Sequence, residues 1–195
     1  MPKCIDVMGK RDSRYLNPQN GALSSANIGG LTNALIAYIM AGAIRSIQSL
    51  KDHIDYRSSA LFHVDIDKTS HGWQEELVNM LVGRIREAIL RPKITDKRVL
   101  NSIEQIYNDY KLSNKKARAE GFNIPDFPSE KEVLDKMRWL FEKSDEIKVQ
   151  VVNSDNDVQS KLNKDGQLNL TSTCNIFIGG NILDRGRVYL HIAEI

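Results

Sequence analysis

Three short apolar segments, separated by long helical stretches, constrain the fold of this chain more than any other feature. Residues 58–64, 147–152 and 174–178 have the length of β-strands and are bounded by charged or turn-forming residues. Between the first two of them, apolar residues recur at the spacing of α-helices. Parallel strands need long crossover connections, which are usually helical. The order therefore predicts an α/β fold with a parallel sheet that contains residues 60–64, 149–152 and 176–178.

The helical stretches divide into three parts. Residues 31–50 carry a helical apolar stripe, and the small residues at 41–43 would allow close packing on one side. A second helix is expected from about His71 to Pro92, because proline cannot continue a helix. Residues 95–143 are predicted to form a helical insertion, with Ser129 as the N-cap of its second helix.

The domain organisation follows from length and local composition. A chain of 195 residues suits one core with an elaboration. Residues 1–30 are rich in Asn, Ser, Gly and charge without a sustained period, so we expect a poorly structured leading segment. Residues 31–195 are then expected to form the α/β lobe, with the helical insertion at about 95–143.

Composition excludes few functions. Apolar residues make up 41% of the chain and charged residues 27%, which favours a folded globular protein. The net charge of +2 is not the basic footprint of a dedicated nucleic-acid module. Cys4 and Cys174 lack the spacing of a disulfide framework or a zinc site, so both are expected to be free thiols. The most apolar run, 34–44, is too short to cross a bilayer, and we expect a cytoplasmic protein without a membrane partner.

The most informative stretch is the loop that follows the last predicted strand. Gly179 and Gly180 end this strand, and Asp184, Arg185 and Gly186 follow. Paired glycines let the backbone approach a ligand, and an arginine can grip phosphate. Parallel α/β sheets bind ligands at the carboxyl ends of their strands. A strand-end turn with an exposed arginine is the alternative interpretation of the same pattern.

A family resemblance adds to this interpretation. Residues 175–186, NIFIGGNILDRG, resemble the core signature of the "Z-one" family, an endonuclease-type Z domain that is found with superfamily II helicase-type ATPases. Weaker matches lie at ALIAYIMAGAIRSI (34–47), ALFHVDIDKTSH (60–71) and VQVVNSD (149–155). Together the matches cover most of residues 34–186.

The resemblance implies the second RecA-like lobe of a helicase-type motor. The strand that contains His63 resembles helicase motif IV, and the loop at Arg185 resembles motif V, which lies near nucleotide and nucleic-acid backbone. It further implies ATP with magnesium as the cofactor of the parent protein, DNA as a partner, and a first motor lobe or partner protein. The residues expected at the nucleotide and nucleic-acid site are Gly179, Gly180, Asn181, Asp184, Arg185 and Gly186.

The chain departs from a complete motor at two points. It contains no G-x-x-x-x-G-K-[ST] loop, which holds the β- and γ-phosphates in P-loop ATPases. After Gly186 it reads RVYLHIAEI, without the helix that carries the arginine finger in the family. We therefore expect a partial lobe that is inactive in isolation, either a truncated gene product or a piece of a longer protein. The alternative is a non-catalytic binding or assembly module that keeps the fold.

Weaker candidates have more ordinary explanations. His63, Asp65 and Asp67 could hold a metal ion for a nuclease reaction, but the two aspartates more simply solvate a strand end. The basic run 111–118 could contact phosphates or form a solvated helix end. Residues with helical core spacing are expected to pack rather than to stack on bases. These are His71, Trp73, Tyr107 and Tyr110.

Overall fold

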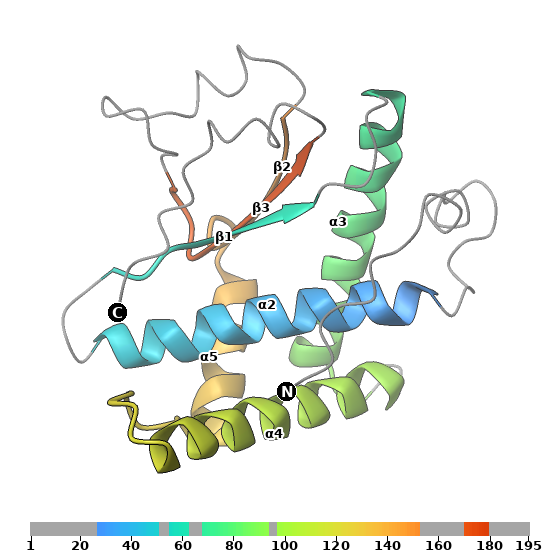
Figure 1. The fold of residues 1–195 in the computed structure, drawn as a ribbon. Coiled ribbons are helices and arrows are strands. Elements are labelled where there is room, and N and C mark those ends of the chain that lie inside the picture. Colours follow the sequence, from blue (N-terminus) through green and yellow to red (C-terminus); the bar gives the residue numbers. More distant parts are fainter. Residues whose placement is uncertain (1–26, 51–54, 63–67, 94–96, 153–169, 180–195) are drawn as a thin grey trace, which may run out of the picture.

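The computed structural model describes residues 27–50, 55–62, 68–93, 97–152 and 170–179 (Figure 1). The described elements, in chain order, are α2 (Asn27–Leu50), β1 (Ser58–Phe62), α3 (Lys68–Leu90), α4 (Lys97–Ala119), α5 (Glu130–Glu142), β2 (Ile147–Val152) and β3 (Cys174–Gly179). α2 begins at Asn27, so the last residues of the expected leading segment 1–30 are already helical.

The three strands form one parallel sheet in the order β1-β3-β2. The prediction of an α/β fold with a parallel sheet is confirmed, because α3, α4 and α5 all lie between β1 and β2 in the chain. β3 is central and all six of its residues are buried. β1 was expected to be a buried strand, but it lies at an edge of the described sheet and Leu61 is 40% exposed. Among the described strands, only β3 has a neighbouring strand on both sides, so only β3 is shielded from solvent along its whole length.

The two faces of the sheet differ as the pleat requires, since successive side chains point to opposite faces. On β3, Cys174, Ile176 and Ile178 belong to the hydrophobic core that the helices form. The β2 residues in register with them, Ile147, Val149 and Val151, pack against the same core. These positions therefore mark the face of the sheet that the helices cover, whereas Leu61 and Phe177 lie on the other face.

α2 is the helix around which the others are arranged. It contacts β3, α3, α4 and α5 (Figure 1), and Leu35, Ile36, Ile39 and Met40 are almost completely buried. A Cβ atom at Gly42 would lie 2.6 Å from the Cys174 sulfur, so this glycine allows α2 to approach β3 closely. The whole helix, unlike the run 34–44, is long and apolar enough to cross a membrane by length and composition, but more than half of that stretch is buried inside the protein.

α4 and α5, which correspond to the predicted insertion, share the core of the sheet and of α2. Val133, Met137 and Leu140 of α5 are fully buried, and α5 contacts both α2 and α3. Ser129 is the N-cap of α5, as predicted, and forms a capping box with Glu132. α3 ends at Leu90, two residues before Pro92. The insertion is therefore a layer of the same hydrophobic core.

Candidate functional site

The carboxyl edge of the sheet is the candidate site because all three described strands end there at the same level. Phe62 of β1 is in register with Ile178 of β3, and Val152 of β2 is in register with Gly179. The strands point the same way in Figure 1. Parallel α/β sheets bind ligands beyond this edge. The connections that leave the three strands therefore start side by side.

Most residues of the predicted loop lie outside the part of the chain that the structure describes. Gly179 is the last residue of β3 and lies beside Val152. The other five expected site residues, Gly180, Asn181, Asp184, Arg185 and Gly186, lie outside the described residues. Their proximity to a ligand stays a prediction.

The proposed metal ligands His63, Asp65 and Asp67 also lie outside the described residues. Within the described ranges, no group of three or more His, Cys, Asp or Glu side chains is arranged to hold a metal ion. The hypothesis of a metal site at this position is not tested.

Gln74 of α3 is a polar residue that the sequence interpretation overlooked. Its side chain is only 3% exposed, and within the described part of the chain neither its amide nitrogen nor its amide oxygen has a hydrogen-bond partner. It lies one helical turn before Leu77 and Val78 on the buried side of α3. An unpaired buried amide costs free energy, so this position is unusual. The signal in the sequence was a glutamine at the start of an apolar stripe.

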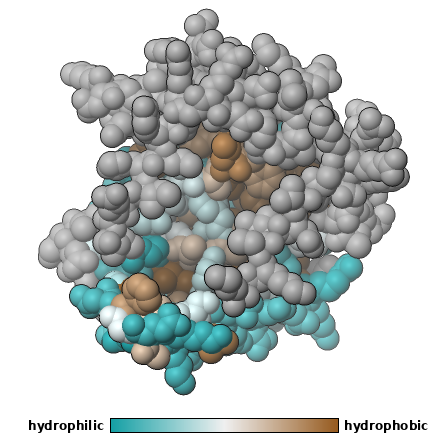
Figure 2. Space-filling view, viewed as in Figure 1, coloured by the Kyte–Doolittle hydropathy of each residue, from teal (hydrophilic) through white to brown (hydrophobic). Residues whose placement is uncertain are grey.

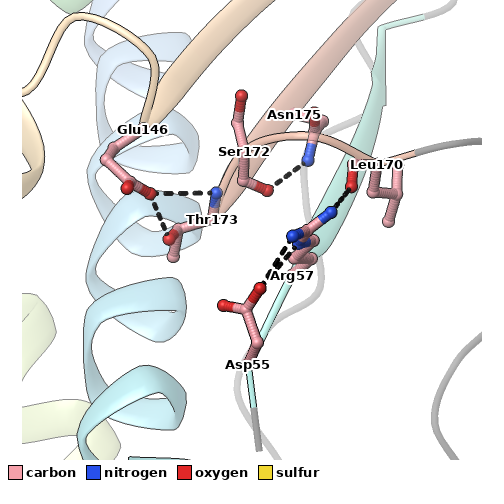
Figure 3. Close-up of polar contacts among 7 residues, drawn as sticks. All are labelled: Asp55, Arg57, Glu146, Leu170, Ser172, Thr173 and Asn175. Carbon is pink, nitrogen blue, oxygen red and sulfur yellow. Dashed lines mark hydrogen bonds and ion pairs between the residues drawn. The ribbon is translucent and has the colours of Figure 1, made fainter.

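The opposite, amino edge of the sheet is held by a polar network (Figure 3). The Glu146 carboxylate accepts hydrogen bonds from the backbone N–H and the hydroxyl of Thr173, with the hydroxyl at 2.6 Å. The Asn175 amide donates to the carbonyls of Ser172 and Ser58 at 2.6 and 3.0 Å. These bonds connect the starts of β1, β2 and β3. The network therefore aligns the strands, and the buried Ser172 hydroxyl is the group in it that has no hydrogen-bond partner among the described residues.

Arg57 extends this network at the surface. Its guanidinium forms an ion pair with Asp55 at 2.7 Å and donates to the Leu170 carbonyl (Figure 3). Both side chains are well exposed, so the pair adds little to the free energy of folding. Its contribution is to position the segment before β3 against β1.

Three side chains between α2 and the sheet complete the amino edge, of which Cys174 is buried and Tyr38 and Ser58 are partly buried. The Tyr38 hydroxyl donates to the Asn175 carbonyl at 3.0 Å, and the Ser58 hydroxyl lies 3.2 Å from the Tyr38 oxygen. Burial raises the pKa of the Cys174 thiol to about 12, and it also raises the pKa of Tyr38 above its usual value. Both groups therefore stay protonated and neutral near neutral pH, which suits a structural contact rather than nucleophilic chemistry.

The basic run 111–118 lies at the end of α4, away from the carboxyl edge of the sheet (Figure 1). Arg118 forms an ion pair with Asp126, and the Lys111 ammonium lies 5.9 Å from the centre of the Tyr107 ring. Tyr107 is buried, as predicted, and the Tyr110 hydroxyl donates to the Ala37 carbonyl. The basic run therefore lies apart from Gly179, the described residue that leads into the predicted loop. The side chains of His71 and Trp73 are not described.

Comparison with known proteins finds a family match that covers most of the chain. The family model of the Z1 domain matches residues 30–188. This range includes nearly all of α2, every other described element and the signature at 175–186. No curated protein and no solved structure matches the chain.

Proposed function

Because this chain belongs to the Z1 domain family, we propose that it is a partial lobe of a nucleic-acid-dependent, helicase-type ATPase. In this proposal the carboxyl edge of the sheet contacts nucleotide and nucleic-acid backbone at the boundary with another lobe. The observation that supports it is that the three parallel strands end at the same level. The Gly-Gly loop therefore begins at the edge where such sheets bind ligands. The RecA-like character of the lobe is part of the proposal.

The chemistry of the loop agrees with a phosphate contact. Glycine at 179 and 180 keeps side-chain bulk away from the strand end, so a phosphate could approach the backbone N–H groups. Arg185 would supply a permanent positive charge with a planar set of donors that matches phosphate oxygens. This pair of features favours binding of a polyanion.

The residues of this chain do not by themselves fit magnesium and ATP. The sequence has no P-loop lysine, and the described residues hold no carboxylate cluster for the metal. A first lobe or partner protein would have to supply these groups. The chain would then contribute orientation and charge at the shared boundary, and we expect no ATP hydrolysis above a heat-denatured control, with or without DNA. Turnover that survives repurification would contradict this expectation.

A non-catalytic binding or assembly module is the second candidate, and the polar amino edge favours it. The network around Glu146 and Asn175 stabilises the sheet without any group poised for chemistry. A metal-dependent nuclease that uses His63 and the nearby aspartates is the least favoured interpretation. Activity measured with the chain alone and with its neighbouring protein segments would separate the module from the motor lobe.

Binding measurements on Arg185→Ala test the leading proposal. The variant should bind single-stranded and duplex DNA more weakly than the parent chain, and the difference should shrink at higher salt because phosphate contacts gain from counterion release. Arg86→Ala is the matched control, since Arg86 is exposed in the last turns of α3 and its replacement removes the same charge. An equal loss in both variants, or no loss in Arg185→Ala, would refute a specific role for the loop. Thermal unfolding of each variant would identify a mere loss of fold.

A further inference from the structure

Two large apolar side chains, one in the C-terminal half of α4 and one just after the helix, lie in solvent. Phe122 is 62% exposed and Leu112 is 51% exposed. Successive helix residues are about 100° apart around the axis, so Leu112 lies roughly opposite the buried Ile103. It is therefore on the outermost side of α4. Single exposed apolar residues are common, whereas two of them towards the end of one helix indicate a candidate contact surface.

The helix end that carries Phe122 is firmly fixed. Gly121 has a φ of +90°, and the backbone N–H groups of Gly121 and Phe122 donate to the carbonyls of Arg118 and Ala117. This pattern is a Schellman cap, in which the hydrophobic residue after the glycine usually packs back on the helix. Here Phe122 remains exposed instead.

The segment that follows is anchored at several further points. The Asn114 amide donates to the Pro125 carbonyl, and the Gln48 amide of α2 donates to the Asp126 carbonyl. The Tyr107 hydroxyl donates to the Pro128 carbonyl, while its ring lies 5.4 Å from that of Phe127. The exposed aromatic ring is thus carried by a pre-ordered turn, which would lower the entropy cost of binding.

Two lysines precede Phe122 by seven and six residues and lie on the same exposed side of α4 as Leu112. Lys115 and Lys116 are exposed, and neither forms an ion pair within the described part of the chain. They follow Leu112 by three and four residues, which places all three on neighbouring positions of the helix surface. Figure 2 shows this lower part of the molecule as mainly hydrophilic, with separate apolar patches.

We propose that Phe122, Lys115 and Lys116 form a contact surface for single-stranded nucleic acid at the end of α4. Proteins that bind single strands without sequence preference combine cationic side chains along the backbone with aromatic rings on which bases stack. A base must be unstacked to reach such a ring, so duplex DNA would use only the lysines. Leu112 adds exposed apolar surface on the same side of α4 as the two lysines.

Other partners fit this surface less well. The apolar side of α4 is already buried against α2 and α3, which leaves too little apolar area for insertion into a membrane surface. A stable protein interface needs a larger contiguous patch than two separated side chains. A contact with a single nucleic-acid strand needs only cationic side chains for the phosphates and an aromatic ring for a base.

The surface lies apart from the carboxyl edge, so it extends the proposed function without depending on the Arg185 loop. The α4 surface would hold the nucleic-acid strand at a second point, on the helical side of the lobe. The inference rests on the proposed function only in assuming that nucleic acid is the partner, and variants at the two places separate the two ideas.

The test uses the full 195-residue chain and a labelled oligothymidylate of roughly ten nucleotides, with a duplex of the same length for comparison. Phe122→Ala should weaken single-strand binding about tenfold and leave duplex binding nearly unchanged, because only the stacked base loses its partner. Leu50→Ala is the matched control, since Leu50 is also 62% exposed but lies at the end of α2.

The charges are tested with Lys115→Gln/Lys116→Gln. This variant should weaken binding of both nucleic acids and reduce the salt slope for the single strand by about 1.4, which is the slope expected for two lost phosphate contacts. The control is Lys93→Gln/Lys97→Gln, which removes the same charge at the other end of α4, with Lys97 roughly 27 Å from Lys115 along the axis at about 1.5 Å per residue.

The outcomes separate the hypotheses. The proposal is overturned if Phe122→Ala binds the single strand like the parent chain, or if both lysine pairs cause the same loss. If the α4 variants bind normally while Arg185→Ala binds weakly, this inference fails and the proposed function stands. If Arg185→Ala binds normally while the α4 variants bind weakly, the α4 surface is supported and the role proposed for the Arg185 loop fails. Circular dichroism melting of every variant confirms that the fold is intact.

Discussion

Replacement of Gly42 by alanine gives the sharpest test of how α2 packs on the sheet. A new Cβ atom would lie 2.6 Å from the Cys174 sulfur, well inside van der Waals contact. Cys174 is fully buried in the central strand, so the sulfur has little space into which it can move. Overpacking of this kind costs about 1–3 kcal/mol. Alanine recovers about 1 kcal/mol through its higher helix propensity.

The net effect is a loss of up to about 2 kcal/mol, which lowers the melting temperature by up to roughly 8 °C for a chain of this size. Gly83→Ala in α3 is the matched control, because no heavy atom lies within 4 Å of a Cβ atom built there. This control should become more stable by up to about 1 kcal/mol, since only the propensity term remains. Urea unfolding of both variants measures the packing cost as the difference between them.

A double-mutant cycle identifies the sulfur as the cause. Cys174→Ala removes the atom that a Cβ at residue 42 would meet, so Gly42→Ala should cost little in that background. The reasoning is refuted if Gly42→Ala stabilises the protein as Gly83→Ala does. It is also refuted if the cost of Gly42→Ala is unchanged after removal of the sulfur.

Four further predictions concern the polar contacts of the core, the helix cap and the buried thiol. Tyr38→Phe removes a partly buried hydroxyl that donates to a backbone carbonyl, so the free energy of unfolding should fall by about 1–3 kcal/mol in urea titrations. Ser129→Ala removes the hydroxyl that accepts from the Glu132 backbone N–H and should cost about 0.5–2 kcal/mol, whereas an unchanged melting temperature would show that the cap is dispensable. The pKa of Cys174 is raised from 9.0 to about 12, so the unfolded chain loses this proton first, and stability that is complete below pH 9 should fall as the pH rises from 9 to 12. In a Cys4→Ser background, a thiol reagent at pH 8 should label Cys174 only after denaturant is added, and rapid labelling of the folded protein would contradict its burial.

Local sequence patterns were sufficient to predict most of the elements. Short apolar runs bounded by turns predicted the three strands, and helical stripes predicted the helices. Both signals depend only on how often a side chain returns to the same face of a strand or a helix. Ser129 was identified as an N-cap for the same reason, since capping involves residues within one turn. The family signature at residues 175–186 was also readable without coordinates, and the Z1 domain match agrees with it.

Tertiary structure alone decided how these elements are arranged. No local pattern specifies that β3, the last described strand in the chain, lies between β1 and β2, because strand order depends on how the crossover helices pack. The same holds for the contact between Gly42 and Cys174, where residues distant in sequence meet across the helix–sheet interface. The unpaired amide of Gln74 became visible only once its burial was known. The sequence thus determined which segments are helices and strands, whereas long-range packing determined which side chains are enclosed, paired or left in solvent.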